Sequence, residues 1–254
     1  MIDIHSHLLP GIDDGAKELE VSLEMARQYV EEGFTKVITT PHWIEHSKMG
    51  LVDKTSVALE KLRAIFAEKN ITLELSLGNE FFITPNLSKS LKKAIGSSLA
   101  GSRYVLVEFP MNEYPLYTDH ALHELQLKGY IPIIAHPERY HYVMSDPNLV
   151  LEWIRRGMLI QVNLPSVAKL YGSGVQDTAR ILLEHGMVHF LATDSHSSGK
   201  RSPRIMKAVR KSGIVSQKEI ELYVNKNPEY ILRDIPFEIE EPREYKKKKK
   251  WFFF

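Results

Sequence analysis

The chain has 254 residues, of which 43% are hydrophobic, and this is enough to bury the core of one α/β domain or of two smaller ones. Its 33 basic and 32 acidic side chains give a formal charge of +1, so no overall basic field indicates nucleic acid as a partner. Five basic residues form the run Lys246–Lys250, which leaves 28 basic against 32 acidic residues elsewhere and makes the rest of the chain mildly acidic.

The chain contains no cysteine, which excludes disulfides, thiolate zinc sites and thiol nucleophiles. A protein-bound metal would therefore be held by nitrogen and oxygen. The first apolar segment begins at once, without the basic stretch and long apolar core of a signal sequence, and no run approaches the ~20 apolar residues that span a bilayer. We expect a cytoplasmic protein.

Helical and strand patterns alternate along the chain. The first helix is expected over residues 18–32, where apolar residues recur at helical spacing and stop at Gly33. Further helices are expected at 57–67, 87–94, 119–128, 147–156, 175–185, 203–211 and 216–225, and strands at 1–4, 37–40, 73–77, 104–107, 131–134, 158–162 and 188–191. About seven strand-helix units favour a closed or nearly closed parallel barrel, because an open sheet would collect its site at one crevice.

Metal-capable side chains follow most of these strands. They are His5, His7, Asp14, His42, Glu80, Glu108, His136, Asp194 and His196. If the strands pair in parallel, these side chains emerge at one carboxyl edge, where α/β folds place their active sites. Alternate residues of an extended segment point to the same side, so His5 with His7, and Asp194 with His196, can face one ion. Nine ligands exceed the about four to six that one ion accepts, which predicts a cluster of ions.

Each of these signals has an ordinary structural alternative. A lone histidine is more often a solvent-facing turn residue, and we interpret the remaining six in that way: His46, His120, His123, His141, His185 and His189. Glu80 and Glu108 each end an apolar strand with no basic residue in the next several positions, so metal cations would supply the missing positive charge. Either glutamate alone could instead reach solvent at the barrel rim or meet an arginine from another unit.

Two arginines are candidate phosphate-binding residues. Arg139 lies three residues after His136, and Arg201 lies five residues after His196. A guanidinium matches two phosphate oxygens at once, although either arginine could equally pair with an acid such as Glu138. Divalent ions about 4 Å apart can bridge a water molecule, lower its pKa and hold the oxygens of a phosphoryl group during an in-line displacement. The motifs together indicate metal-dependent phosphate ester hydrolysis.

These residues resemble the PHP (polymerase and histidinol phosphatase) superfamily and, within it, the bacterial capsule-type tyrosine-protein phosphatases. The resemblance runs through residues 2–15, Thr40–His42, Gly78–Glu80, Val107–Glu108, Ala135–Arg139 and Ala192–His196. It implies a distorted seven-stranded β/α barrel, which we assign to residues 1–235. It also implies three metal ions, usually described as manganese, while iron, zinc and magnesium suit the same donors.

The resemblance assigns roles to individual side chains. One ion would be held by His5, His7, Glu80 and Asp194, a second by Glu80, Glu108 and His136, and a third by Asp14, His42 and His196. Asp13 is the alternative to its neighbour Asp14, since the loop geometry decides which of them turns inward. Arg139 and Arg201 fall where the family places its phosphate-binding arginines. The implied mechanism is direct attack on phosphorus by a metal-bridging hydroxide.

The resemblance further implies tyrosine-phosphorylated proteins as substrates, in particular a membrane-linked bacterial tyrosine kinase that controls exopolysaccharide or capsule synthesis. We expect residues 236–254 to form a mobile tail. Lys246–Lys250 followed by Trp251–Phe254 resembles a short interfacial anchor, which could bring the protein to the inner face of the membrane. The alternative is a solvated terminal tail.

Other functions are compatible with the same motifs. A histidinol-phosphate phosphatase would use the same chemistry on a small substrate. A nuclease would cleave diesters, and the lack of a basic groove signal argues against it. A metal-holding adaptor without activity would have broken ligand or arginine positions, and none is evident in the sequence.

Overall fold

The computed structural model describes residues 1–47, 51–92 and 97–247. The strands are β1 (Ile2–Ser6), β2 (Lys36–Thr39), β3 (His42–Trp43), β4 (Glu74–Leu77), β5 (Glu80–Phe82), β6 (Tyr104–Glu108), β7 (Ile131–Ala135), β8 (Leu159–Asn163) and β9 (Phe190–Ala192). The α-helices are α1 (Leu19–Glu32), α2 (Val52–Glu68), α3 (Leu87–Lys92), α4 (Thr118–Leu127), α5 (His141–Ser145), α6 (Asn148–Arg155), α7 (Leu164–Val167), α8 (Ser173–Glu184), α9 (Met206–Ser212), α10 (Gln217–Glu221) and α11 (Pro228–Leu232). Short 3-10 helices lie at Leu99–Gly101 and Pro137–Arg139, and a π-helical turn lies at Leu222–Lys226. Within these described ranges, no helix combines the length and apolar character needed to cross a membrane.

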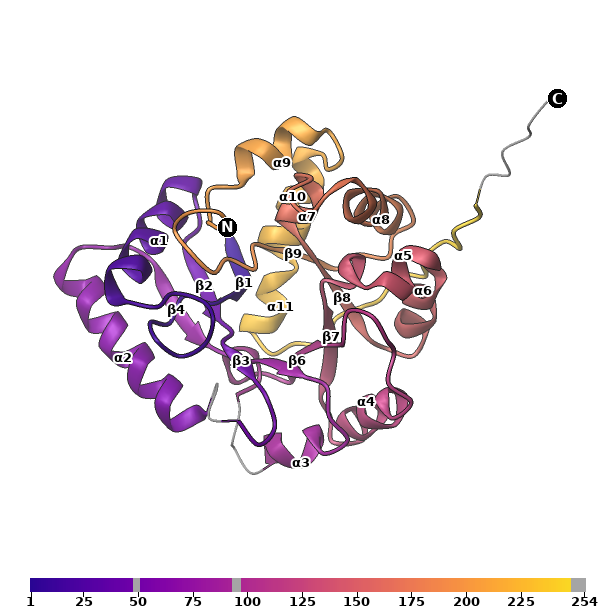
Figure 1. The fold of residues 1–254 in the computed structure, drawn as a ribbon, viewed down its shortest axis with the longest axis horizontal. Helices are drawn as coiled ribbons and strands as arrows, with labels where there is room; N and C mark the ends of the chain where they lie inside the picture. The colour runs from indigo at the N-terminus through magenta and orange to yellow at the C-terminus, as the bar shows by residue number, and fades with distance from the viewer. Residues whose placement is uncertain (48–50, 93–96, 248–254) are drawn as a thin grey trace.

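The strands pair in parallel in two orders, β1-β2-β4 and β3-β5-β6-β7-β8-β9. β3 continues β2 after a two-residue break, and β5 continues β4 in the same way, so each pair is one bent strand. β9 returns to β1 through a bridge between Ser6 and Ser195, where the N–H of His7 donates to the Ser195 carbonyl. Seven strands therefore follow one another in a ring. Most helices lie around this ring, whereas α11 lies across its middle, where Ile231 packs into the smaller buried cluster (Figure 1). The predicted α/β fold is confirmed, and its strand order is that of a barrel distorted at the two breaks.

Alternate residues of the strands face the interior of the ring and the surrounding helices in turn. In β6, Tyr104 and Leu106 belong to the smaller buried cluster inside the ring, whereas Val105 and Val107 belong to the larger cluster shared with the helices. The interior row of β6 ends in Glu108. The inward-facing side chains of β6 are thus apolar at the amino end of the strand and acidic at its carboxyl end.

The two breaks have local causes. Pro41 lies in the first break, directly after the predicted strand 37–40 and before His42, and proline has no N–H to donate to a ladder. Gly78 lies in the second break, where a Cβ would be 2.8 Å from Leu99 Cδ2, so only glycine fits without a shift.

The predicted helices are present with small shifts in their ends. Helix 18–32 corresponds to α1 and ends at Gly33, which has a φ of 88°. The predicted helix 216–225 is instead α10 followed by the π-helical turn. The short helices α5 and α7 were not predicted, because one turn is too short to show a helical period. Residues 93–94 of the predicted helix 87–94 lie outside the described residues.

The C-terminal segment lies against the body of the protein as far as it is described. The N–H of Arg243 donates to the His185 carbonyl at 2.9 Å, and Tyr245 exchanges hydrogen bonds with Asn148 at 3.0 and 2.9 Å. The ring centroid of Phe237 is 5.0 Å from that of Tyr230. The division at residue 235 stays a prediction, and residues 248–254 of the predicted membrane anchor lie outside the described part of the chain.

Candidate metal centre

The predicted site residues converge on one pocket at the carboxyl edge of the strands. The pocket has a volume of about 430 Å³ and is lined by Asp14, His42, Ile44, Glu80, Phe82, Glu108, His136, Arg139, Asp194, His196 and Arg201. Of the eleven predicted residues, only His5 and His7 are missing from this lining, and both are fully buried directly beneath it. Their ring nitrogens lie 3.3 and 3.4 Å from Glu80 Oε2.

Three imidazoles are held by their Nδ1 atoms so that Nε2 faces the pocket. The Nδ1–H of His5 donates to Gln161 Oε1 at 2.9 Å, and that of His7 donates to Asp13 Oδ2 at 2.6 Å. The Nδ1–H of His196 donates to the backbone carbonyl of Asp194 at 3.0 Å. This arrangement fixes the tautomer and leaves each Nε2 lone pair for a cation, which is the usual second shell of metal-bound histidine.

Glu80 lies at the centre of the group. Its Oε2 is 2.9 Å from His42 Nδ1, and its Oε1 is 3.0 Å from His136 Nε2. Glu108 lies farther out, with its two oxygens 3.6 Å from His136 Nε2 and 3.7 Å from His42 Nδ1. Glu80 is therefore placed to share its two oxygens between ions.

The structure separates the roles of the neighbouring residues Asp13 and Asp14. Asp13 turns away from the pocket, where it holds His7 and accepts from the N–H groups of His42 and Gly15, both at 2.9 Å. Asp14 turns inward, with Oδ1 3.4 Å from His42 Nε2. The same oxygen is also 3.4 Å from the Nε2 of His196 on the other side of the pocket. Asp14 is thus the member of the pair whose carboxylate lies beside the pocket histidines, and its role as a metal ligand stays a prediction.

Asp194 joins the imidazoles to the arginines. Its Oδ1 is 3.5 Å from His5 Nε2, whereas its Oδ2 accepts from Arg139 at 3.2 Å and from Arg201 at 2.8 Å. The guanidinium of Arg139 also lies over the ring of Tyr171, 5.0 Å from its centroid. Both arginines therefore point at one place in the pocket and keep part of their surface open to solvent.

Two buried amides that the sequence analysis missed complete the support of the site. Gln161, which accepts from His5, donates to Asn163 Oδ1 at 2.7 Å, and Asn163 Nδ2 donates to Asp194 Oδ2 at 2.7 Å. All four side chains are at most 1% exposed. The four residues form a relay that orients His5 and Asp194 together. The available signal was the pair of amides at alternate positions of an apolar strand, since buried amides need partners.

The electrostatics of the pocket favour bound cations. Burial opposes the charge of Glu80, but the neighbouring histidines, His5 foremost, outweigh it and hold the pKa of Glu80 well below its ordinary value. Burial and the nearby charge of Glu80 raise the pKa of Glu108 to about 8. Burial, reinforced by Arg139, lowers the pKa of His136 to about 4. Carboxylates this close cannot all be ionised without positive charge between them.

The backbone is strained at two of the site residues. His136 has a φ of 33° and Asp194 a φ of 49°, in the left-handed region that non-glycine residues rarely adopt. His136 directly follows β7 and Asp194 is the second residue after β9, so both unusual backbone conformations lie at the carboxyl edge of the strands. Such strain typically accumulates at functional sites.

The spacing of the ligand atoms fits metal binding. Atoms bonded to one ion at about 2.1 Å lie roughly 3.0–3.4 Å apart. The Nε2 atoms of His5 and His7 face each other at 3.3 Å, a contact between two acceptors that a shared cation would explain. Three overlapping groups of mutually close ligand atoms can be drawn: His5, His7 and Glu80; His42, Glu80 and Glu108; and His7, Asp14, His42 and His196.

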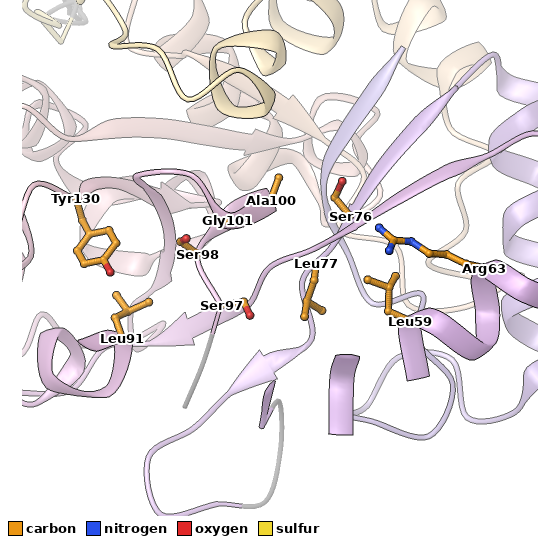
Figure 2. Close-up of a pocket in the computed structure, with 10 residues that line it drawn as sticks. All are labelled: Leu59, Arg63, Ser76, Leu77, Leu91, Ser97, Ser98, Ala100, Gly101 and Tyr130. Carbon is orange, nitrogen blue, oxygen red and sulfur yellow. The ribbon is translucent and has the colours of Figure 1, made fainter. Parts of the chain in front are cut away.

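A separate hollow of about 450 Å³ lies on the flank of the ring, between α2, β4 and the segment before β6 (Figure 2). Its lining includes Arg63, which already donates to the Leu75 carbonyl and pairs with Glu60. None of the eleven predicted site residues lines this hollow. This hollow is therefore no part of the predicted site.

A family model described as capsular polysaccharide synthesis, CpsB/CapC, matches residues 1–233. The chain belongs to the CpsB/CapC family. The matched range contains every predicted site residue and ends two residues before the predicted boundary at 235. The resemblance to capsule-type tyrosine-protein phosphatases is therefore confirmed.

Members of the CpsB/CapC family resemble the chain over its length. The tyrosine-protein phosphatase YwqE of Bacillus subtilis (strain 168) is 32% identical over 254 residues, which cover 100% of both chains. The tyrosine-protein phosphatase CpsB of Streptococcus pneumoniae is 30% identical over 243 residues, which cover 92% of this chain and 99% of that protein. A crystal structure from work on these two proteins, described as unique metal-dependent tyrosine phosphatases, matches with a TM-score of 0.90 and 32% identity. It covers 97% of this chain and 100% of the other.

Proposed function

We propose that the chain is a metal-dependent phosphatase that hydrolyses phosphotyrosine in proteins. The observation that carries the proposal is the convergence of nine metal-capable side chains and two arginines at one pocket. The relatives named above as tyrosine-protein phosphatases, one of them represented by a structure described as metal-dependent, support the same reaction for this chain.

The proposed cofactor is manganese, with three ions in the pocket. The ligands would be His5, His7, Glu80 and Asp194 for the first ion, Glu80, Glu108 and His136 for the second, and Asp14, His42 and His196 for the third. Imidazole and carboxylate donors without sulfur suit manganese, and they also suit iron, zinc and magnesium. When bound, such ions supply Lewis acidity towards phosphoryl oxygens and lower the pKa of a coordinated water. The three overlapping ligand groups support a cluster rather than a single ion.

The two arginines would bind the phosphate of the substrate. Arg139 and Arg201 both donate to Asp194 Oδ2, so their guanidinium groups already converge on one point. A phosphate oxygen placed there would accept charged hydrogen bonds from both arginines, which are stronger than neutral ones. The tyrosyl oxygen, with a pKa near ~10, needs less proton assistance to leave than an alkyl oxygen would. We assign no general acid.

The proposed substrates are tyrosine-phosphorylated proteins, in particular a membrane-linked bacterial tyrosine kinase of exopolysaccharide or capsule synthesis. The description of the CpsB/CapC family supports this setting. We further propose a cytoplasmic protein that meets the inner face of the membrane through Lys246–Phe254, where lysines attract anionic headgroups. Of that segment, the described residues Lys246 and Lys247 are exposed. The balance of 33 basic and 32 acidic residues, without a basic groove signal in the sequence, argues against nucleic acid as a substrate.

One set of assays tests this function. The purified protein with Mn²⁺ is given a phosphotyrosine peptide, histidinol phosphate and single-stranded DNA, and we expect hydrolysis of the peptide. Faster hydrolysis of histidinol phosphate would instead identify a small-molecule phosphatase, and metal binding without any hydrolysis would identify an adaptor. His136→Ala should abolish peptide hydrolysis and lower the bound metal content measured by mass spectrometry. His120→Ala, an exposed histidine on α4, is the matched control and should change neither.

A further inference from the structure

The pocket has an apolar wall beside its metal-capable side chains. Of the eleven lining residues, Ile44 and Phe82 are the two that are apolar. Ile44 is 39% exposed and Phe82 is half-buried. Single exposed apolar side chains are common on proteins, so the position of these two carries the argument.

The strand pairing places Phe82 above a proposed metal ligand. β3 and β5 are parallel, with His42 opposite Glu80 in register. Side chains alternate along a strand, so Phe82, the last residue of β5, faces the same side as Glu80. Two residues of strand rise roughly 6.6 Å, which places Phe82 one layer above Glu80, towards the mouth of the pocket. Ile44 directly follows β3 and lines the same pocket as His42.

The neighbouring strand closes this layer on its other side. Phe82 is opposite Glu108 of β6 in register, so the phenyl ring and that carboxylate share one level of the pocket wall. The ligand layer below is charged, while the layer above is apolar on the side of β3 and β5. An aryl phosphate ester, in which one oxygen joins a charged phosphate to an aryl group, would place its phosphate in the charged layer and its aryl group in the apolar layer.

The opposite wall of the pocket is charged. Arg139 and Arg201 converge at Asp194, where the proposed function places the phosphate. The face of the Arg139 guanidinium lies against the ring of Tyr171. An aryl group that extends from the phosphate towards the mouth finds the two apolar side chains of the lining, Ile44 and Phe82, on the other side.

We propose that Ile44 and Phe82 form a subsite for the aryl group, which makes the pocket select aryl over alkyl phosphate esters. The inference rests on the proposed function for the identity of the natural aryl group as tyrosine. It concerns specificity, because neither side chain carries a group that can take part in the hydrolysis.

The test compares the binding of two phosphonates that the enzyme cannot hydrolyse. Phenylphosphonate and methylphosphonate share the charged group and differ in the ring, and calorimetry gives their Kd values with the Mn²⁺-loaded protein. The wild type should bind phenylphosphonate about fivefold more tightly or better, the factor expected for one aromatic contact. Phe82→Ala should remove most of this preference while the Kd of methylphosphonate stays unchanged, and Ile44→Ala should reduce it.

The control is Leu116→Ala, which removes an apolar side chain that is 102% exposed in the loop after β6 and does not line the pocket. It should keep the wild-type preference. Equal binding of the two phosphonates by the wild type, or an equal loss of both in Phe82→Ala, would overturn the subsite. Hydrolysis of a phosphotyrosine peptide is measured in parallel: an aryl preference without hydrolysis would remove the proposed function and leave the subsite standing.

Discussion

Replacing Gln161 by leucine should weaken metal binding without touching a proposed ligand. Leucine has nearly the same size but cannot accept from His5 Nδ1–H, now at 2.9 Å, or donate to Asn163 Oδ1, now at 2.7 Å. Both partners are 0% exposed, so no bulk water replaces the lost bonds. Two unpaired buried groups at about 1–3 kcal/mol each should lower the free energy of unfolding by roughly 2–6 kcal/mol.

Gln161→Leu should weaken metal binding because the side chains of His5 and Asp194 are no longer held in one orientation. The ring of His5 loses the contact that fixes its tautomer and orientation, and Asn163 loses the neighbour that aligns it with Asp194. Removal of such a second-shell partner typically costs 10–100-fold in metal affinity, or about 1.4–2.7 kcal/mol. Competition with a chromophoric chelator measures the Mn²⁺ affinity directly. The half-saturating Mn²⁺ concentration for phosphotyrosine hydrolysis should rise by the same factor, and the rate should recover at high Mn²⁺.

Two further variants separate orientation from packing. Gln126→Leu removes one hydrogen bond, to the carbonyl of Arg156 directly after α6, and should leave the Mn²⁺ affinity unchanged. Gln161→Glu keeps an acceptor for His5 but has no donor for Asn163, so an intermediate affinity is expected. Gln161→Leu could instead lower the stability and still bind Mn²⁺ as tightly as the wild type. In that case the hydrogen bonds of Gln161 and Asn163 stabilise the fold without orienting the metal ligands, and the reasoning is refuted.

Three other predictions concern the metal, the phosphate and pH. Mn²⁺ at about 100 times its Kd should raise the free energy of unfolding by about 2.7 kcal/mol per ion. Removal of the metal by a chelator should therefore lower the Tm by roughly 5 °C or more in a thermal scan. An unchanged Tm would speak against a bound ion. Arg201→Lys keeps the positive charge but loses the planar guanidinium that donates to Asp194. The value of kcat/KM for a phosphotyrosine peptide should therefore fall about 10-fold or more. An unchanged kcat/KM would show that Arg201 does not bind the phosphate. The structure buries His189, so its interpretation as a solvent-facing histidine was wrong. Burial lowers the pKa of His189 to about 4, and the Ile160 N–H donates to its Nδ1, so the folded protein keeps this ring neutral. The unfolded chain binds that proton below pH 6.5, so stability should be full above pH 6.5 and fall by about 3 kcal/mol between pH 6.5 and 4. His189→Asn should show a shallower slope of unfolding free energy against pH over that window, and an equal slope would contradict the assignment.

The sequence predicted the parts of the site that follow from strand periodicity. An interior row such as Tyr104, Leu106 and Glu108 changes from apolar to acidic at the carboxyl end of its strand, and this change is visible without coordinates. The parallel order of the strands then brings such ends together. The nine ligand candidates could be found for that reason, although each alone has an ordinary explanation.

The supporting residues could not be assigned in the same way, because their roles depend on partners from distant strands. Gln161 lies in the predicted strand 158–162 and Asn163 directly follows it, and their function depends on His5 in β1 and on Asp194 after β9. Period-two patterns give the face of a side chain but not its partner across a ring. Asp13 and Asp14 show the same limit, since both lie in one loop and only its fold determines which carboxylate turns inward.

The two breaks in the strands explain why this loop is part of the site. β1 pairs with β2 only as far as Ser6 opposite Thr39, and β3 beyond the break pairs with β5 instead. The carboxyl end of β1 is thus separated from β3, and a backbone opening would remain between them. Asp13 closes it, because one carboxylate oxygen accepts from both the His7 ring and the His42 N–H. The distortion of the barrel therefore admits the loop that carries the inward carboxylate, and a regular barrel with β3 paired to β1 would leave it no place.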